Sequence, residues 1–156
     1  MCIRDRLEAQ LGYLEAAGYK AITPAELRLA LESHRPLPAG SLLLTFDDGY
    51  ADFRSTAAPL LVAHGFSATV FLVTDLVGGV AEWDRALGDP VPLMSWAEVT
   101  DLAARGFTFG SHGASHRKLN RLSTAEVREE GIRSRDAIAK RLGRAPTAVC
   151  LSLIHI

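Results

Sequence analysis

The sequence predicts an α/β fold in which helices cover a parallel sheet. Short runs of apolar and β-branched residues alternate with longer segments of helical periodicity, and strands that are apolar on both faces are typical of parallel sheets buried under helices. Capping signals mark where several of the helices begin. The 156 residues, 48% hydrophobic and 22% charged, have the composition of one globular domain.

The elements are expected in an alternating order along the chain. Their boundaries come from apolar periodicity and from glycine and proline at the breaks. In chain order we expect a helix at 7–17, a helix at 24–33, a strand at 42–46, a helix at 51–64, a strand at 68–73, a helix at 96–105, a strand at 107–110, a helix at 124–142 and a strand at 147–150.

The helix boundaries follow from local chemistry. In a capping box, a serine or threonine bonds the amide three residues later while a glutamate there bonds back, and glycine at a helix end accepts the left-handed conformation. The predicted boxes are Thr23 with Glu26, Ser95 with Glu98 and Ser123 with Glu126, and the terminating glycines are Gly18, Gly65, Gly106 and Gly143. The charges from Glu126 to Arg141 have mixed signs, which predicts a solvated helix face.

Charge and hydropathy argue against nucleic-acid binding and against a membrane-spanning segment. The formal net charge is −1, and the charges form no basic stripe, so we expect no nucleic-acid partner. No apolar run approaches the roughly 18 residues that cross a bilayer, and we expect no transmembrane segment in this chain.

We expect the two ends of the chain to differ in origin from the rest. Inverted copies of one short DNA element can encode both MCIRDR (1–6) and LSLIHI (151–156). That element resembles the mosaic end of a transposon used to prepare sequencing libraries. We therefore expect residues 1–6 and 151–156 to be sequencing-adapter scars flanking part of a domain at 7–150.

Two adjacent aspartates follow the predicted strand at 42–46. Asp47 and Asp48 precede Gly49, where the backbone can turn sharply. Two carboxylates in a poorly solvated site cannot both ionise easily unless a cation or a proton is present. The alternative is that one aspartate caps the following helix while the other is solvated.

A histidine pair follows another predicted strand. His112 and His116 are four residues apart, and Gly110, Ser111 and Gly113 around them favour a tight loop. If the segment turns helically, both imidazoles can reach one ion. Together with a carboxylate they suit zinc, with cobalt or nickel as alternatives, whereas two unrelated exposed histidines are the alternative reading.

Three protein ligands with open positions describe a catalytic rather than a structural metal. A cation held there could polarise a carbonyl group and acidify a water molecule, and the aspartate that is not a ligand could accept the proton. Spacing alone does not tell which aspartate has which role.

These residues resemble a known family. "TFDDGY" and, some sixty residues later, "GSHGASHRKL" resemble the first two motifs of the polysaccharide deacetylases, the carbohydrate esterases of family four that share the NodB homology domain. "ATVFLVTDLVGG" and "MSWAEVTDLAARGF" are also similar to that family. The resemblance implies that Asp47 is the catalytic base and that Asp48, His112 and His116 bind the metal.

The resemblance also implies a fold, a reaction and a location. The family fold is a distorted (β/α) barrel with fewer than eight strands, and its reaction is metal-dependent hydrolysis of N-acetyl or O-acetyl groups on a polysaccharide or oligosaccharide. An exported or cell-envelope location is implied as well. Tyr50 and Trp83 could line a sugar subsite, although packing explains them equally well.

Later motifs of the family are missing from this sequence. An aromatic-proline-glycine turn is expected after Cys150, where the scar begins, and a tryptophan-lined pocket and a general-acid histidine are expected later. We therefore expect a partial barrel without its C-terminal strands, inactive by itself. Two other functions stay open: hydrolysis of a non-sugar amide or cyclic imide, and glycan binding without catalysis.

Overall fold

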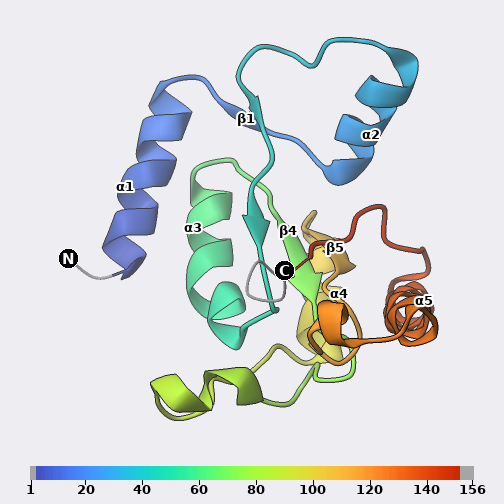
Figure 1. The fold of residues 1–156 in the computed structure, drawn as a ribbon. Helices are drawn as coiled ribbons and strands as arrows, with labels where there is room; N and C mark the ends of the chain where they lie inside the picture. The colour runs from blue at the N-terminus through green and yellow to red at the C-terminus, as the bar shows by residue number, and fades with distance from the viewer. Residues whose placement is uncertain (1–2, 152–156) are drawn as a thin grey trace.

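The computed structural model describes residues 3–151. Its helices and strands alternate along the chain, as the sequence predicts (Figure 1). The helices are α1 (Ile3–Ala16), α2 (Pro24–Ser33), α3 (Ala58–Ala63), α4 (Trp96–Ala104) and α5 (Thr124–Leu142), and the strands are β1 (Lys20–Ala21), β2 (Ser41–Leu42), β3 (Thr45–Phe46), β4 (Thr69–Leu72) and β5 (Thr108–Ser111).

The central sheet has three parallel strands in the order β3-β4-β5. All four residues of β4 are buried, because a strand lies on each side of it and the hydrophobic core packs against it. A separate parallel pair joins β1 to β2. The parallel α/β prediction is confirmed, and the described part of the chain forms an open arrangement rather than a closed barrel.

The strand predicted at 42–46 is two short strands with different partners. β2 pairs with β1, while β3 pairs with β4. The carbonyl of Leu44, between them, accepts a hydrogen bond from Thr69 N at 2.9 Å. The change of partner interrupts the ladder, and one apolar run does not reveal such a change because the partners are distant in sequence.

The strand predicted at 147–150 is reduced to one parallel bridge between Ser111 and Val149. Ser111 N donates to Ala148 O at 3.1 Å and Cys150 N donates to Ser111 O at 2.9 Å. Within residues 3–151, no further strand pairs with this segment. It therefore continues the sheet next to β5 by only one residue pair.

The helix starts are confirmed where capping boxes predict them. Both reciprocal hydrogen bonds of the box form at Thr23, Ser95 and Ser123. The first helix begins at Ile3 instead of residue 7, so part of the presumed scar continues it. The helix predicted at 51–64 contains a π-helical turn, Phe53–Ala57, before α3. Pro59 lacks the amide that a regular helix needs there, which explains the irregular turn.

The hydrophobic core lies between the helices and the sheet. Leu61 of α3, Val70 of β4 and Leu102 of α4 are fully buried in one cluster. In Figure 1, α1 and α3 lie to the left of the sheet and α4 and α5 to its right. This packing fixes the strands from which the candidate site projects.

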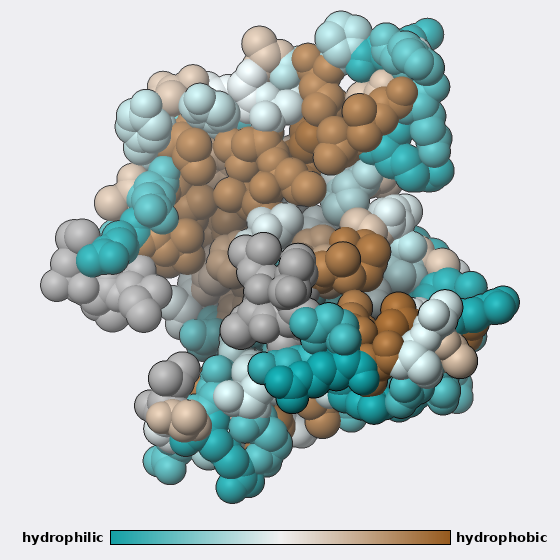
Figure 2. Space-filling view, in the orientation of Figure 1, coloured by the Kyte–Doolittle hydropathy of each residue, from teal (hydrophilic) through white to brown (hydrophobic). Residues whose placement is uncertain are grey.

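Apolar residues also reach the surface. Figure 2 shows an apolar area between α1 and α2, and Leu29 and Leu31 of α2 are 64% and 68% exposed. None of the described helices combines the length and the apolar character needed to cross a membrane.

Candidate metal centre and active site

The candidate residues lie at one edge of the central sheet. Asp47 and Asp48 directly follow β3, and His112 directly follows β5. Because β3, β4 and β5 are parallel, their carboxyl ends lie together, and β4 separates the two ligand-bearing segments. The edge at which α/β proteins commonly carry their chemistry therefore holds all four predicted residues.

A tight turn at Gly49 fixes the backbone that carries Asp47 and Asp48. Gly49 has φ +79°, and a Cβ atom there would lie 2.7 Å from Leu72 Cδ2, so a side chain would clash with the core. Gly49 N donates to Asp47 O at 2.8 Å, and Gly49 O accepts from Met94 N at 2.9 Å. The turn thus rests on β4 and on the segment that leads into α4.

The histidine segment turns without becoming helical. His112 N donates to Leu72 O at 2.9 Å, which continues the β4–β5 ladder by one bond. Gly113 and His116 then have φ values of +87° and +59°. These left-handed residues reverse the chain, so the helical turn considered for His112 to His116 is wrong, although both imidazoles still reach the same place.

The side chains of Asp48, His112 and His116 converge. Asp48 Oδ1 lies 3.4 Å from the Nε2 atoms of both histidines, and the exposed side-chain fractions are 17%, 2% and 4% in that order. Ligands at 2.0–2.1 Å in tetrahedral geometry stand about 3.4 Å apart. Asp48 Oδ1 is buried yet has no hydrogen-bond partner. The three atoms therefore fit the ligand set of a divalent cation.

The electrostatics favour an ionised Asp48. Burial by itself would raise the pKa of this carboxyl group, but the contact with His116 and the positive charge that each histidine carries when it is protonated outweigh burial and lower the pKa below its usual value. Asp48 is thus a carboxylate when the site takes up a cation.

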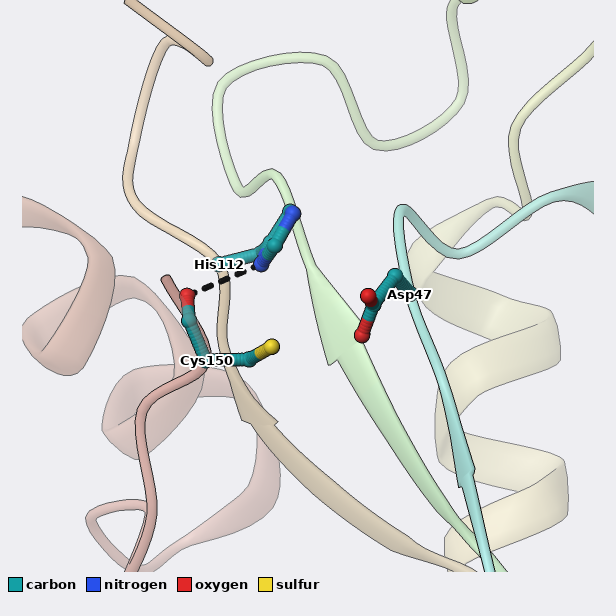
Figure 3. Close-up of side chains that lie close together, drawn as sticks. All are labelled: Asp47, His112 and Cys150. Atoms are coloured by element: carbon teal, nitrogen blue, oxygen red, sulfur yellow. Dashed lines mark hydrogen bonds between the residues drawn. The ribbon is translucent and has the colours of Figure 1, made fainter. Parts of the chain in front are cut away.

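The tautomer of His112 also suits metal binding. His112 Nδ1 lies 2.9 Å from Cys150 O, drawn as a dashed line in Figure 3. A carbonyl oxygen only accepts, so Nδ1 carries the hydrogen and donates it. In the neutral imidazole that a metal binds, this bond leaves the lone pair of Nε2 facing Asp48, as in histidine ligands whose second nitrogen is fixed by a carbonyl group.

Asp47 belongs to a second possible ligand group. Its carboxylate, a ring nitrogen of His112 and Cys150 Sγ lie within 4.8 Å of one another (Figure 3). Burial, together with the negative charge of Asp47, raises the pKa of the Cys150 thiol to about 11. Asp47 is exposed, whereas the side chains of Asp48, His112 and His116 are all largely buried, so the latter group is the better enclosed of the two.

Aromatic residues pack against His116. The Trp83 ring lies 4.0 Å from the His116 ring, centroid to centroid. Trp83 Nε1 donates to the Tyr50 hydroxyl at 3.2 Å, and that hydroxyl donates to Asp84 at 2.5 Å. Burial and the bond to Asp84 raise the pKa of Tyr50. Trp83 therefore packs against the candidate metal ligand His116, and Tyr50 holds Trp83 by a hydrogen bond. A role of either residue in sugar binding stays a prediction.

One buried carboxylate at the site escaped sequence reasoning. Glu130 of α5 accepts hydrogen bonds from the backbone of Ala114 and Ser115, between the two histidines. The solvated face predicted for α5 is present, but the prediction did not include the buried stripe of Glu130, Ser134 and Ile138 on the other side of this helix. Their spacing of four residues places them on one face of the helix, and this was the signal available in the sequence.

Comparison with known proteins identifies the family. The family model for polysaccharide deacetylases matches residues 34–152. The chain belongs to the polysaccharide deacetylase family. The match covers both the aspartate pair and the histidine pair, so every residue of the converging site in this polysaccharide deacetylase lies within the matched region.

Individual relatives agree with the family assignment. The YxkH protein of Bacillus subtilis strain 168 is 28% identical over 127 residues, which cover 81% of this chain and 42% of that protein. The poly-β-1,6-N-acetyl-D-glucosamine N-deacetylase of Escherichia coli K12 is 31% identical over 101 residues, covering 62% of this chain and 15% of the enzyme.

The fold is also similar to that of a solved deacetylase. The Streptococcus pyogenes deacetylase PplD, solved in complex with acetate, superposes with a TM-score of 0.81 at 25% identity, covering 94% of this chain and 61% of PplD. The chain spans at most 42% of the length of the curated relatives named here. Nearly all of the fold of this polysaccharide deacetylase chain therefore has a counterpart within the longer PplD chain.

Proposed function

We propose that this chain carries the metal site and the catalytic base of a hydrolase that removes acetyl groups from N-acetylated glycans. The observation that carries the proposal is the position of Asp48 Oδ1, 3.4 Å from both histidine Nε2 atoms and without a hydrogen-bond partner. The named substrate of the Escherichia coli relative, a polymer of N-acetylglucosamine, supports the choice of glycan. Removal of O-acetyl groups would use the same site.

In this proposal each residue has one role. Asp48, His112 and His116 hold the cation, which is zinc, with cobalt or nickel as alternatives. A cation bound there would polarise the acetyl carbonyl and acidify a water molecule. Asp47, exposed beside the buried ligands, takes the proton from that water as general base.

The space next to the histidines supports access by a substrate. A cavity of about 520 Å³ adjoins His112 and His116 and is bounded by Leu119, Val127 and Val149, among others. Its apolar walls suit a methyl group, and it adjoins the candidate site on the histidine side, since neither Asp47 nor Asp48 lines it. The larger cavity, about 610 Å³, is bounded by Pro24, Phe107 and Leu142, away from the acidic pair.

Activity is proposed for the intact protein rather than for this chain alone. Among residues 3–151 we assign no donor to the developing oxyanion and no acid to the leaving amine. Loss of one oxyanion donor commonly lowers kcat by about 10²–10³. We therefore expect the 156-residue chain to release acetate very slowly, and we expect the intact protein to be exported or to be part of the cell envelope.

Two substitutions test the roles. In the intact protein, Asp47→Asn should leave zinc binding unchanged, because it removes the base alone. The same substitution should lower the rate of acetate release from acetylated glucosamine oligomers by about 10²–10⁴-fold. His112→Ala should lose the metal, measured as bound zinc per chain after dialysis. Equal loss of zinc in both variants would contradict the assignment of base and ligand.

The substrate class needs a separate comparison. The intact protein should release acetate from N-acetylated oligosaccharides and leave cyclic imides unchanged. Turnover of the imide without acetate release would indicate a non-sugar hydrolase on the same scaffold. Glycan binding without release of any product would indicate a binding domain.

A further inference from the structure

We propose that Glu130 is a positioning residue that holds the loop between His112 and His116 in the shape required for metal binding. This inference rests on the proposed metal site. Glu130 belongs to α5 and acts on the loop through the backbone amides of Ala114 and Ser115.

Burial makes the position of Glu130 unusual. The residue is only 4% exposed, and a buried carboxylate is strongly unfavourable unless hydrogen bonds or charges compensate it. Burial raises the pKa of Glu130, but bonds from Ser115 and Ala114 outweigh this effect and lower the pKa. The hydrogen bonds from the loop thus keep the Glu130 carboxylate ionised inside the protein.

The hydrogen bonds join Glu130 to two consecutive residues of the loop. Its Oε2 atom accepts from Ala114 N at 2.9 Å and from Ser115 N at 2.8 Å, and its Oε1 atom accepts from the Ser115 hydroxyl at 2.6 Å. Hydrogen bonds to an ionised acceptor are about twice as strong as neutral ones. Three of them fix the chain directly before His116.

The opposite side of the loop is held by the segment that follows β4. Thr74 N donates to Gly113 O at 3.3 Å, and Asp75 N donates to Ala114 O at 2.9 Å. The loop is therefore bonded through its carbonyl groups on one side and through its amides to Glu130 on the other. A Cβ atom at Gly113 would lie 3.5 Å from Glu130 Oε2, so the two approach closely.

This arrangement has a direct consequence for His116. Its φ of +59° is a left-handed conformation that costs about 1 kcal/mol or more outside glycine, so the loop needs outside contacts to keep it. When the acceptor for Ser115 is weakened, the loop can relax, and His116 Nε2 then moves away from Asp48 Oδ1. Metal affinity should fall even though every ligand is still present.

The test uses the 156-residue chain and zinc alone. Glu130→Gln keeps the size of the side chain but removes its charge, so the one remaining oxygen can make only neutral, weaker hydrogen bonds to the loop amides, and an NH₂ group takes the place of the other acceptor. Loss of such supporting contacts typically lowers metal affinity by about 10–100-fold. We expect this loss in the zinc dissociation constant measured by chelator competition, together with changed absorption bands of the cobalt-loaded protein.

Glu129→Gln is the matched control. Glu129 precedes Glu130 on the same helix but is exposed, and its nearest cation, Arg133, is 3.9 Å away. This variant removes the same charge and should bind zinc as tightly as the wild type. Circular dichroism spectra and melting temperatures of all variants verify that binding is measured on folded protein.

The outcomes separate this inference from the proposed function. If the wild type binds no zinc, the metal site itself is wrong. If the wild type and Glu130→Gln bind zinc equally, the positioning role is overturned. Should Glu130→Gln fail to fold, Ser115→Ala removes only the hydroxyl bond to Glu130; we expect a severalfold weaker affinity, and an unchanged affinity would overturn the inference.

Discussion

Two candidate ligands have a backbone conformation that is uncommon outside glycine. Among the described residues other than glycine, positive φ values occur at His34, Asp48 and His116. His34 is the C-cap of α2, where a left-handed residue is ordinary. At Asp48 and His116 no helix end explains it, and such outliers often mark functional sites. Backbone and side-chain geometry thus indicate the same site independently.

Cys150 offers a test between the two possible ligand groups. Cys150→Ser should leave the zinc affinity unchanged within about twofold, because the thiol is protonated at neutral pH and its carbonyl, not its sulfur, contacts His112. Chelator competition measures this affinity. A large loss of affinity would instead favour the group of Asp47, His112 and Cys150.

The sequence predicts the aspartates and histidines of the site better than it predicts the residues that hold them in place. Paired aspartates and histidines after strands predict one cluster, because parallel strands bring their carboxyl ends together. The sequence does not predict the burial of Glu130, because the mixed charges around it predict only a solvated helix face. Its role depends on loop amides fifteen and sixteen residues away, and no local pattern encodes that contact.

At the scale of elements, the sequence predicts the helix starts well but does not predict which strands pair. The three capping boxes form as expected, since each needs only residues three positions apart. The division of the run at 42–46 into β2 and β3 follows instead from two different partner strands. β1 has only two residues, too few to show a periodic pattern.

The start of α5 should carry a measurable pH dependence. Glu126 accepts from the Ser123 amide and hydroxyl and from Arg117, and these bonds lower its pKa to about 2. Because the folded pKa lies below the unfolded one, the stabilisation is full above pH 4.5 and is lost as the pH falls toward 2. Glu126→Gln should therefore lower the melting temperature at neutral pH by more than it does in acid.

Thermal unfolding followed by circular dichroism between about pH 6 and pH 3 measures this difference. Glu129→Gln, on the same helix, controls for the loss of one surface charge and should leave the acid dependence as in the wild type. A melting-temperature difference between Glu126→Gln and wild type that stays constant across this range would contradict the assignment.

At the scale of the whole molecule, the proposed ligands come from parts of the chain that are far apart. Asp48 lies in the turn after β3, and the two histidines lie some sixty residues later, after β5. The strand between them, β4, is fully buried. A cation bound by all three side chains would therefore connect segments on both sides of the core.

Zinc should accordingly stabilise the chain as a whole. Free zinc at a hundredfold excess over Kd adds about 2.7 kcal/mol to the free energy of unfolding, which raises Tm by roughly 5–10 °C in a domain of this size. Calorimetry with and without zinc measures the shift, and a chelator should reverse it. His112→Ala should show no shift; an equal shift in that variant would indicate binding elsewhere.

The order β3-β4-β5 has a practical meaning for protein engineering. Adjacent strands are about 4.8 Å apart, so the acidic turn and the histidine loop stand on supports separated by roughly two such spacings. Grafting the two loops onto neighbouring strands of another scaffold would bring them too close. The portable unit is a block of three strands, in which the middle one serves as spacer and donates no ligand.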